Sequence, residues 1–379
     1  MLIVAPQLGF TPNGEIVPGG LLNFGRCVAR AVASFPGMKK LGVWCQVDMA
    51  GSEAYIERML RVYADDHVEL DIRCFGGSQT KLTVAVSQAS ITRTYDHVMY
   101  LLVNQSVLAN LPFHLPYSVW EIGRELFEPV SRWKYEALNH ANHLLSISKN
   151  TSDQAVRNNP GLRPAQIVHL CVEPPLYERE LEADPVTQQP FNPAERDPAV
   201  LILGNLHREY LYKGHAELIQ GWTEVHKACP QAELWIGGDG DGRSVLEGLV
   251  KQLPFDVGQQ IKFLGRLSDS EVQKYFSRCR VFAMPSRGEG FGLVFVEAAR
   301  YGVPCIGGKY DSAKEIVLHG ETGLLTEQTP HDVASACVQL LSDDVMAKCM
   351  GEAGRARYLN NFRYHHFRER LLHAMELDQ

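Results

Sequence analysis

Two glutamates beside a glycine-rich turn are the residues of this 379-residue chain whose types and spacing most favour chemistry. Glu289 lies in the turn RGEGFG, and Glu297 follows it in an apolar stretch that we expect to be helical. The glycines at 288, 290 and 292 let the backbone pass close to a ligand, and a helix beginning there points its N–H groups at an anion. The pattern predicts a diphosphate-binding turn with two carboxylates that accept hydrogen bonds from hydroxyls. Spacing alone leaves open that both glutamates are solvated surface acids.

Other common chemistries have no matching pattern in the sequence. We find no Ser-His-Asp or Cys-His arrangement, and no pair of carboxylates set for a two-step displacement. The nine cysteines are scattered without a C-x-x-C pair, so neither a disulfide framework nor a metal site is indicated. A formal net charge of -7 argues against nucleic acid as a partner, because such binding needs dense Lys and Arg.

The elements that must position these residues alternate between short apolar runs and longer amphipathic segments, which is typical of parallel sheets with crossover helices. In the first half we predict helices at 21–33, 53–63 and 130–140, and strands at 1–5, 41–46, 69–74, 97–103, 117–120, 144–148 and 167–170. In the second half we predict strands at 199–204, 232–238, 260–265, 280–286 and 303–308. Ligands of such folds bind at the carboxyl ends of the strands.

The chain is long enough for two domains. A proline-rich, acid-containing stretch from 172 to 198 has few apolar runs and reads as a linker. We therefore predict an N-terminal Rossmann-like domain at 1–175, a linker at 176–198 and a C-terminal Rossmann-like domain at 199–360. The remaining residues, 361–379, are expected to form a closing helix.

The chain start, MLIVAPQLGF, reads as a buried strand and not as a signal peptide. No uninterrupted apolar stretch reaches the roughly 20 residues needed to cross a bilayer. We expect a cytoplasmic protein, and any contact with the inner face of the cell membrane would be peripheral.

The segment around the two glutamates, E-G-F-G-L-x-x-x-E-A-x-x-x-G-x-P, resembles the donor signature of the GT-B retaining glycosyltransferases of family 4. The likeness continues through GNLHREYLYKG (204–214), WIGGDGDG (235–242), FLGRLSDSEV (263–272), FAMPS (282–286) and DSAKEIVLHGETGLL (311–325). It covers nearly all of 199–325. The resemblance implies two Rossmann-like domains facing across a cleft, with the C-terminal helix packing back on the first domain.

The resemblance also implies a role for each matched donor-site residue. Glu289 would bind the sugar of a nucleotide-sugar donor, Glu297 its ribose, and Lys213 would stabilise the leaving diphosphate. The backbone N–H groups of Gly290, Phe291, Gly292 and Leu293 would bind the phosphates. Arg266 and Leu267 would flank the base. For Lys213 the alternative is an exposed loop lysine.

One departure concerns the second cation of the family. The residue after Gly204 is usually arginine in the family, whereas this chain has Asn205. Arg208 is the substitute that we predict for the diphosphate, although a role as a surface arginine remains equally open.

The first half offers weaker candidates. Gly19 and Gly20, before a predicted helix, resemble the family loop that faces the cleft, but they would equally make a tight turn. Relatives carry a histidine in the region matching PYSVWEIGREL (116–126), and this chain does not. We predict Glu121 and Arg124 as cleft or acceptor-side residues, and Trp120 as either core or a platform for a sugar ring.

Together these features predict an enzyme that moves a hexose from a UDP- or GDP-sugar to a hydroxyl of a carbohydrate or lipid-linked glycan, in polysaccharide or glycoconjugate synthesis. We expect no cofactor and no metal, since the nucleotide sugar is a substrate. Two alternatives remain: an α-glycan synthase or phosphorylase, and a GT-B-like binding or scaffold protein that has lost catalysis.

Overall fold

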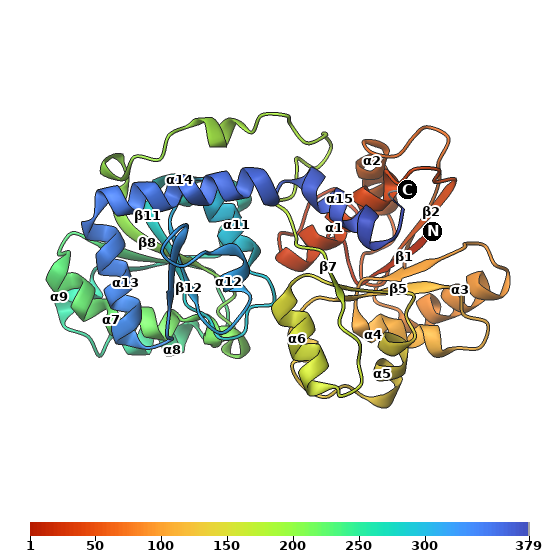
Figure 1. Ribbon diagram of the computed structural model, residues 1–379, viewed down its shortest axis with the longest axis horizontal. Helices are drawn as coiled ribbons and strands as arrows, with labels where there is room; N and C mark the ends of the chain where they lie inside the picture. Colours follow the sequence, from red (N-terminus) through yellow and green to blue (C-terminus); the bar gives the residue numbers. More distant parts are fainter. Residues whose placement is uncertain (378–379) are drawn as a thin grey trace. The chain divides into compact units, whose positions relative to one another are not determined.

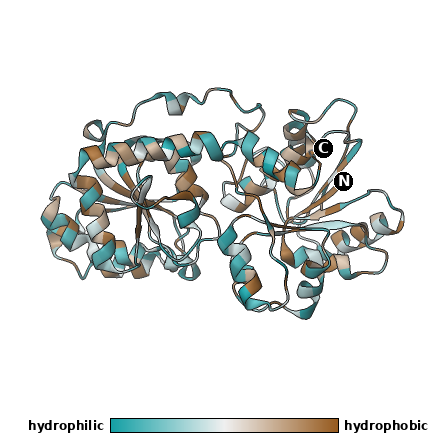
Figure 2. Ribbon diagram, viewed as in Figure 1, coloured by the Kyte–Doolittle hydropathy of each residue, from teal (hydrophilic) through white to brown (hydrophobic). Residues whose placement is uncertain are grey.

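The computed structural model describes residues 1–377, except for the side chain of Arg124, and these residues form two compact units. Unit 1 comprises Met1–Leu181 together with the chain from Arg363 onward, and unit 2 comprises Glu182–Phe362. Each unit is a parallel sheet covered by helices (Figure 1). The strands are mostly hydrophobic and the covering helices carry hydrophilic residues, as buried parallel sheets require (Figure 2).

Unit 1 contains a seven-stranded sheet with the order β3-β2-β1-β4-β5-β6-β7. Its strands are β1 (Leu2–Ala5), β2 (Lys40–Cys45), β3 (Glu69–Cys74), β4 (Val98–Tyr100), β5 (Tyr117–Glu121), β6 (His143–Ser146) and β7 (Gln166–Ile167). Its helices are α1 (Gly20–Ala33), α2 (Glu53–Arg61), α3 (Gln79–Ile91), α4 (Val103–Ser106), α5 (Arg132–Asn139), α6 (Lys149–Asn158) and α15 (Tyr364–Ala374), with 3-10 turns η1 (Val107–Asn110) and η2 (Arg124–Leu126).

These elements confirm the strands and helices predicted for the first half, to within a few residues at their ends. The sequence analysis did not predict α3. Two of its apolar side chains, Val84 and Ile91, are exposed, so the helix lacks the continuous apolar stripe by which amphipathic helices are recognised.

Helix α15 belongs to unit 1 although it ends the chain. Phe367 stacks on Trp120 with ring centroids 6.4 Å apart, and Phe24 of α1 meets the same indole edge-on at 5.0 Å. Arg368 donates hydrogen bonds to the hydroxyl and the carbonyl of Ser34 at 2.6 and 2.9 Å. These contacts place α15 against the core of the first unit.

Unit 2 contains a six-stranded sheet with the order β10-β9-β8-β11-β12-β13. Its strands are β8 (Asp197–Leu203), β9 (Glu233–Gly237), β10 (Ile261–Gly265), β11 (Cys279–Met284), β12 (Cys305–Gly308) and β13 (Gly323–Thr326). Its helices are α7 (His215–Ala228), α8 (Arg243–Val250), α9 (Phe255–Gly258), α10 (Asp269–Arg278), α11 (Leu293–Arg300), α12 (Ala313–Ile316), α13 (Pro330–Ser342) and α14 (Asp344–Asn361), with 3-10 turns η3 (Pro185–Gln188), η4 (Pro193–Glu195) and η5 (Arg208–Lys213). Strands β8 to β12 match the predicted ones.

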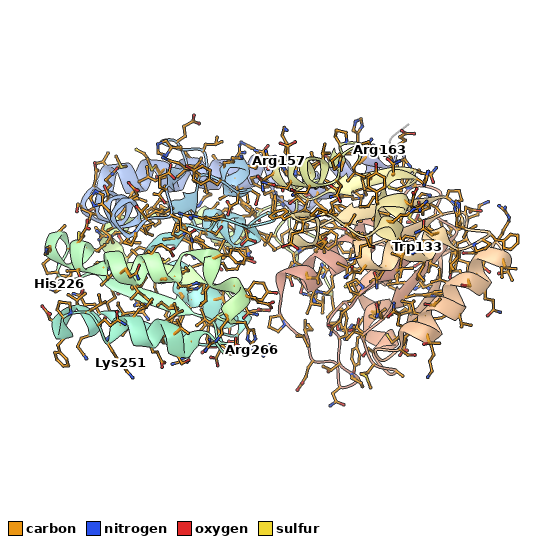
Figure 3. The ribbon with its side chains drawn as sticks, turned by 90° about the horizontal axis from the view of Figure 1, so that it is seen from below. Trp133, Arg157, Arg163, His226, Lys251 and Arg266 are labelled. Carbon is orange, nitrogen blue, oxygen red and sulfur yellow. The ribbon has the colours of Figure 1, made fainter. Side chains whose placement is uncertain are left out.

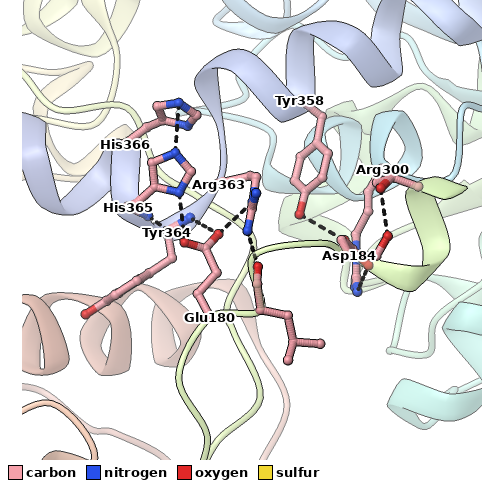
Figure 4. Close-up of polar contacts among 10 residues, drawn as sticks. Glu180, Asp184, Arg300, Tyr358, Arg363, Tyr364, His365 and His366 are labelled. Atoms are coloured by element: carbon pink, nitrogen blue, oxygen red, sulfur yellow. Dashed lines mark hydrogen bonds and ion pairs between the residues drawn. The ribbon is translucent and has the colours of Figure 1, made fainter.

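The segment predicted as a linker, 176–198, is divided between the units at Leu181. In unit 1 the Glu180 carboxylate accepts hydrogen bonds from Arg363 Nε and from the backbone N–H and the ring of His365, at 2.9 to 3.0 Å (Figure 4). In unit 2 the Asp184 carboxylate binds Arg300 at 2.5 Å (Figure 4). Each half of the segment is therefore bonded to its own unit. The two units meet in the sequence directly after Leu181, without the separate linker that we predicted between them.

Candidate functional site

An ion pair joins two of the predicted donor-site residues in unit 2. Lys213 Nζ lies 2.6 Å from Glu289 Oε2, and both side chains are largely buried. Lys213 ends η5, which follows β8, and Glu289 lies in the turn between β11 and α11. Burial alone would lower the pKa of Lys213, but the charge and hydrogen bond of Glu289 raise it above its ordinary value. A cation and an anion therefore stand together at the carboxyl ends of two adjacent strands.

Asp311 fixes the backbone at Glu289. Its Oδ2 accepts a hydrogen bond from the Glu289 N–H at 3.0 Å and another from the Ser286 hydroxyl. Ser312 Oγ donates to the Glu289 carbonyl at 2.7 Å. Burial raises the pKa of Asp311 to about 6. The sequence analysis assigned no role to Asp311 or Ser312, because their link to the turn spans more than twenty residues; their position just after a glycine-ended strand was the available signal.

The glycine-rich turn ends in the N-terminus of α11. Gly292 is the N-cap residue with φ +89°, and a Cβ there would lie 2.7 Å from the Phe295 ring and 3.3 Å from Glu289 Cγ. Only glycine suits this left-handed and crowded position. With the predicted phosphate-binding residues Gly290, Phe291 and Leu293 around it, the helix begins directly beside Glu289.

Glu297, the second predicted glutamate, lies on α11 and is half-buried. Burial and the nearby charge of Asp269 raise its pKa to about 7, and Arg300 partly opposes this effect. Two predicted base-flanking residues follow β10: Arg266 is exposed (Figure 3), and Leu267 lies near Gly237 at the end of β9. All of them therefore belong to loops or helices at the carboxyl edge of the unit 2 sheet.

Arg208, the predicted substitute cation, is exposed and lies beside Asp241. Its backbone N–H donates to Asp241 Oδ1 at 3.0 Å, and its Nε lies 4.0 Å from Oδ2. Asn205, which stands at the usual arginine position, accepts a hydrogen bond from the His207 N–H at 2.9 Å. Asn205 thus shapes the loop between β8 and η5, and the structure pairs Arg208 with an acid of unit 2.

His215, at the start of α7, is a further buried group next to Lys213 that sequence reasoning missed. It is fully buried, and neither ring nitrogen has a hydrogen-bond partner among the described residues. Burial and the charge of Lys213 lower its pKa to about 3, so the ring is neutral at physiological pH. The side chains of Lys213 and His215 both pack over Gly204. A neutral ring here lets Lys213 remain the local cation.

In unit 1, Gly19 and Gly20 are exposed at the N-terminus of α1. In the nearby loop after β1, backbone N–H groups already bind the carboxylate of a protein side chain. The buried Asp48 carboxylate accepts hydrogen bonds from the N–H groups of Leu8 and Gly9 at 2.6 and 3.0 Å. These N–H groups are therefore occupied by the protein itself, whereas the glycine pair remains accessible.

Trp120 is fully buried between α1 and α15. Of its two predicted roles, the structure supports the core and excludes a platform for a sugar ring, because no face of the indole reaches solvent. The side chain of Arg124 lies outside the described part of the chain.

Glu121, the next residue, ends β5 and carries a buried acid. Among the described residues, neither carboxylate oxygen has a hydrogen-bond partner. The neighbouring Ser146 hydroxyl donates to the Glu121 and Ser148 carbonyls instead. Burial raises the pKa of Glu121 to about 8, so the side chain is protonated at neutral pH. Because its side chain is fully buried, Glu121 does not line an open surface of the structure, which corrects its prediction as a cleft or acceptor-side residue.

We expect the stability of unit 1 to fall as pH rises from about 5 to about 8. The unfolded chain releases this proton near 4.5, whereas the native state keeps it to about 8, so the native state binds more protons across this interval. Glu121→Gln should flatten the dependence and raise stability at pH 8 by an amount on the order of 2 kcal/mol. Urea unfolding at several pH values measures both effects. The exposed Glu128 supplies the control, Glu128→Gln; equal slopes in all three proteins would contradict the burial of a neutral Glu121.

Residues 1–377 contain no group of three or more His, Cys, Asp or Glu side chains arranged to hold a metal ion. Within the same residues, no helix combines the length and apolarity needed to span a membrane.

Two Rossmann-like parallel sheets, with a charged site at the carboxyl edge of the second, define the class of this fold as GT-B. The crystal structure of HepE from Anabaena in complex with UDP and glucose covers 99% of this chain and 98% of its own, with a TM-score of 0.70 at 18% identity. Sucrose-phosphate synthase from Thermosynechococcus elongatus has a TM-score of 0.69 and the same coverage and identity. At this identity the likeness concerns the fold alone.

Residues 185–357, which include the Lys213–Glu289 pair, match the model of the family Glycosyl transferases group 1. A GDP-mannose-dependent phosphatidylinositol monomannoside mannosyltransferase of Corynebacterium glutamicum is 35% identical over 172 residues, 43% of this chain and 44% of the relative. The N-acetyl-alpha-D-glucosaminyl L-malate synthase of Bacillus anthracis is 35% identical over 148 residues, 39% and 38% of the two chains. The matches thus span less than half the length of these curated relatives.

Proposed function

We propose that this protein is a retaining glycosyltransferase that transfers a hexose from a UDP- or GDP-sugar to a hydroxyl of a carbohydrate or lipid-linked glycan, in polysaccharide or glycoconjugate synthesis. The observation that carries the proposal is the Lys213–Glu289 ion pair at the start of α11. The match of residues 185–357 to the family Glycosyl transferases group 1 and the similarity to a GDP-mannose-dependent mannosyltransferase support it.

In this proposal the ion pair is the resting state of the donor site. The donor diphosphate competes with Glu289 for Lys213, and the first-turn N–H groups of α11 bind its oxygens. Glu289 is then available to accept hydrogen bonds from the sugar hydroxyls, and Glu297 from those of the ribose. As the bond from the anomeric carbon to the diphosphate breaks, Lys213 stabilises the charge on the leaving phosphate.

Retention follows if the acceptor hydroxyl attacks from the face that the diphosphate leaves. The departing phosphate oxygen then takes the proton of that hydroxyl, so no separate nucleophile is needed. The absence of a second carboxylate suited to a covalent step in the sequence supports this route. No cofactor and no metal enter the proposal, since Lys213 and backbone N–H groups supply the positive field.

The test is binding and slow hydrolysis of GDP-mannose, UDP-glucose and UDP-N-acetylglucosamine by the full chain. We expect one donor to bind and to release its nucleotide. Glu289→Gln should lower affinity for that donor by about tenfold, while affinity for the free nucleotide should not fall, because the amide no longer competes for Lys213. If no nucleotide or nucleotide sugar binds, the scaffold alternative replaces the enzyme.

A further inference from the structure

The side chain of Lys213 is packed along its length, so the position of its ammonium group depends on its backbone. A Cβ at Gly204 would lie 3.1 Å from Lys213 Cδ, which shows that the lysine stem passes directly over the backbone after β8. Nζ lies 2.6 Å from Glu289 Oε2 and 5.9 Å from the centre of the Tyr212 ring, and the side chain is only 15% exposed. A shift of the Lys213 backbone is therefore transmitted to Nζ, because a packed stem has few other rotamers.

The residues before and after Lys213 both contact the chain that leaves β11. The Tyr212 carbonyl accepts a hydrogen bond from the Arg287 N–H at 3.3 Å. Gly214 has φ +95°, and a Cβ there would lie 2.6 Å from the ring of Pro285. The chain after β11 continues into the turn that carries the ion-pair partner of the lysine. The backbone of Lys213 thus lies against the same segment as that partner.

Gln328 donates a second hydrogen bond to the Tyr212 carbonyl. Its Nε2 lies 2.7 Å from that oxygen, closer than the Arg287 N–H group. The Gln328 carbonyl accepts a hydrogen bond from Arg287 Nη2 at 3.1 Å. Gln328 is 7% exposed, and a buried hydrogen bond is costly to leave unmade. Three segments therefore meet at the residue before Lys213: η5, the turn after β11 and the chain after β13.

The segment that contains Gln328 is itself fixed between β13 and α13. Thr329, the next residue, is the N-cap of α13 and accepts a hydrogen bond from a backbone N–H of that helix. A Cβ at Gly221 of α7 would lie 2.4 Å from the Pro330 carbonyl oxygen, so the start of α13 lies against α7. A donor supported by rigid elements fixes its acceptor more precisely than a donor on a free loop.

We propose that Gln328 is a positioning residue of the transferase, whose amide fixes the Tyr212 carbonyl and thereby sets Lys213 Nζ where the diphosphate departs. The inference rests on the proposed function, because only transfer from a nucleotide sugar requires a cation at this point. Gln328 acts through the backbone of η5 and need not contact the donor. Its loss should therefore lower the rate more than the affinity, since a misplaced cation loses most where charge is developing.

The experiment compares the full chain with Gln328→Met, which removes the donor and keeps the length of the side chain. We expect kcat for hydrolysis of the preferred nucleotide sugar to fall by about tenfold to 100-fold, with little change in KM. The pKa of Lys213, which the charge and hydrogen bond of Glu289 raise in the wild type, should fall because this contact lengthens. NMR of lysines reductively methylated with labelled formaldehyde measures it, with the Lys213 signal assigned by its loss in Lys213→Arg. Mere destabilisation would reduce the amount of active protein without changing this pKa in the folded molecules.

The matched control is Gln339→Met, because Gln339 is an exposed glutamine of α13 whose amide donates to Ser335 of the same helix at 3.4 Å. It should keep the wild-type kcat and the wild-type pKa of Lys213. Should Gln328→Met fail to fold, Gln328→Asn withdraws the amide by one methylene and should show the same two changes.

Two outcomes would overturn the positioning role while the transferase stands: an unchanged pKa of Lys213, or an unchanged kcat where Lys213→Ala is impaired. Absence of turnover in the wild type would instead contradict the transferase, and the pKa comparison would still test whether Gln328 sets the position of Lys213.

Discussion

Lys213→Ala should lower turnover of the preferred nucleotide sugar by about 100- to 1000-fold, the usual cost of removing one preorganised group that stabilises charge in a transition state. Lys213 is the cation of a largely buried pair with Glu289, and Glu289 raises its pKa, so it is fully charged at neutral pH. The neutral His215 beneath it adds no second charge. In the variant, only the N–H groups at the start of α11 remain to stabilise the charge on the departing diphosphate.

The measurement is nucleotide release at saturating donor, with donor affinity followed separately. Lys309→Ala is the matched control, because Lys309 is an exposed lysine of unit 2 that pairs with Glu327 at 3.4 Å. It should retain wild-type turnover. An unchanged rate in Lys213→Ala, with donor still bound, would mean that the diphosphate departs elsewhere and would remove the basis of the proposed function.

The loss should fall mainly on kcat. Lys213 is already paired in the resting protein, so a bound phosphate exchanges one anionic partner for another and gains little ground-state affinity. The charge that grows on the leaving oxygen is new, and only the transition state benefits fully from it. A variant that changed KM alone would indicate that Lys213 merely binds the donor.

The sequence could predict the strands of unit 2 and the turn at Glu289 because their signals are local. Buried parallel strands appear as short apolar runs that end in glycine, and the left-handed N-cap at Gly292 requires the residue found there. Lys213 needed the family resemblance, since no local rule distinguishes a lysine that faces an acid from one that faces water. Its contact with Glu289 joins residues 76 positions apart.

The residues that escaped prediction depend on which neighbours the fold supplies. Trp120 and Glu121 are neighbours in β5 and point to opposite faces of the sheet, yet both are fully buried because the strand is covered on each face. Neighbouring residues alternate between buried and exposed only in a strand that has one face in solvent. Asp311 looks like any loop acid until Ser286 and the Glu289 N–H are brought to it. The Pro-rich segment has the composition of a linker. The sequence does not reveal that Asp184 within it binds Arg300, because Arg300 lies over a hundred residues away.

Gly308→Ala should destabilise unit 2 by about 3 kcal/mol or more, a larger loss than most single substitutions cause. Gly308 ends β12, and a Cβ there would lie 1.9 Å from the carbonyl oxygen of Ser286, two residues after the end of β11. Because the obstacle is backbone, no rotamer change relieves the clash, and the two strand ends must separate. Ser286 also donates to Asp311, which holds the Glu289 N–H, so the strain reaches the donor site directly.

Chemical unfolding of the full chain should show the effect as an earlier transition of unit 2, with the transition of unit 1 in place, because separate domains unfold as separate cooperative units. Gly248→Ala is the control: Gly248 lies within α8, and a Cβ there meets no atom within 4 Å. That variant should gain about 0.5–1 kcal/mol from reduced freedom of the unfolded chain. If Gly308→Ala were as stable as Gly248→Ala, the chain after β11 and the end of β12 could not lie as close as the structure places them. The hydrogen bonds of Asp311 that orient Glu289 would then not form as described.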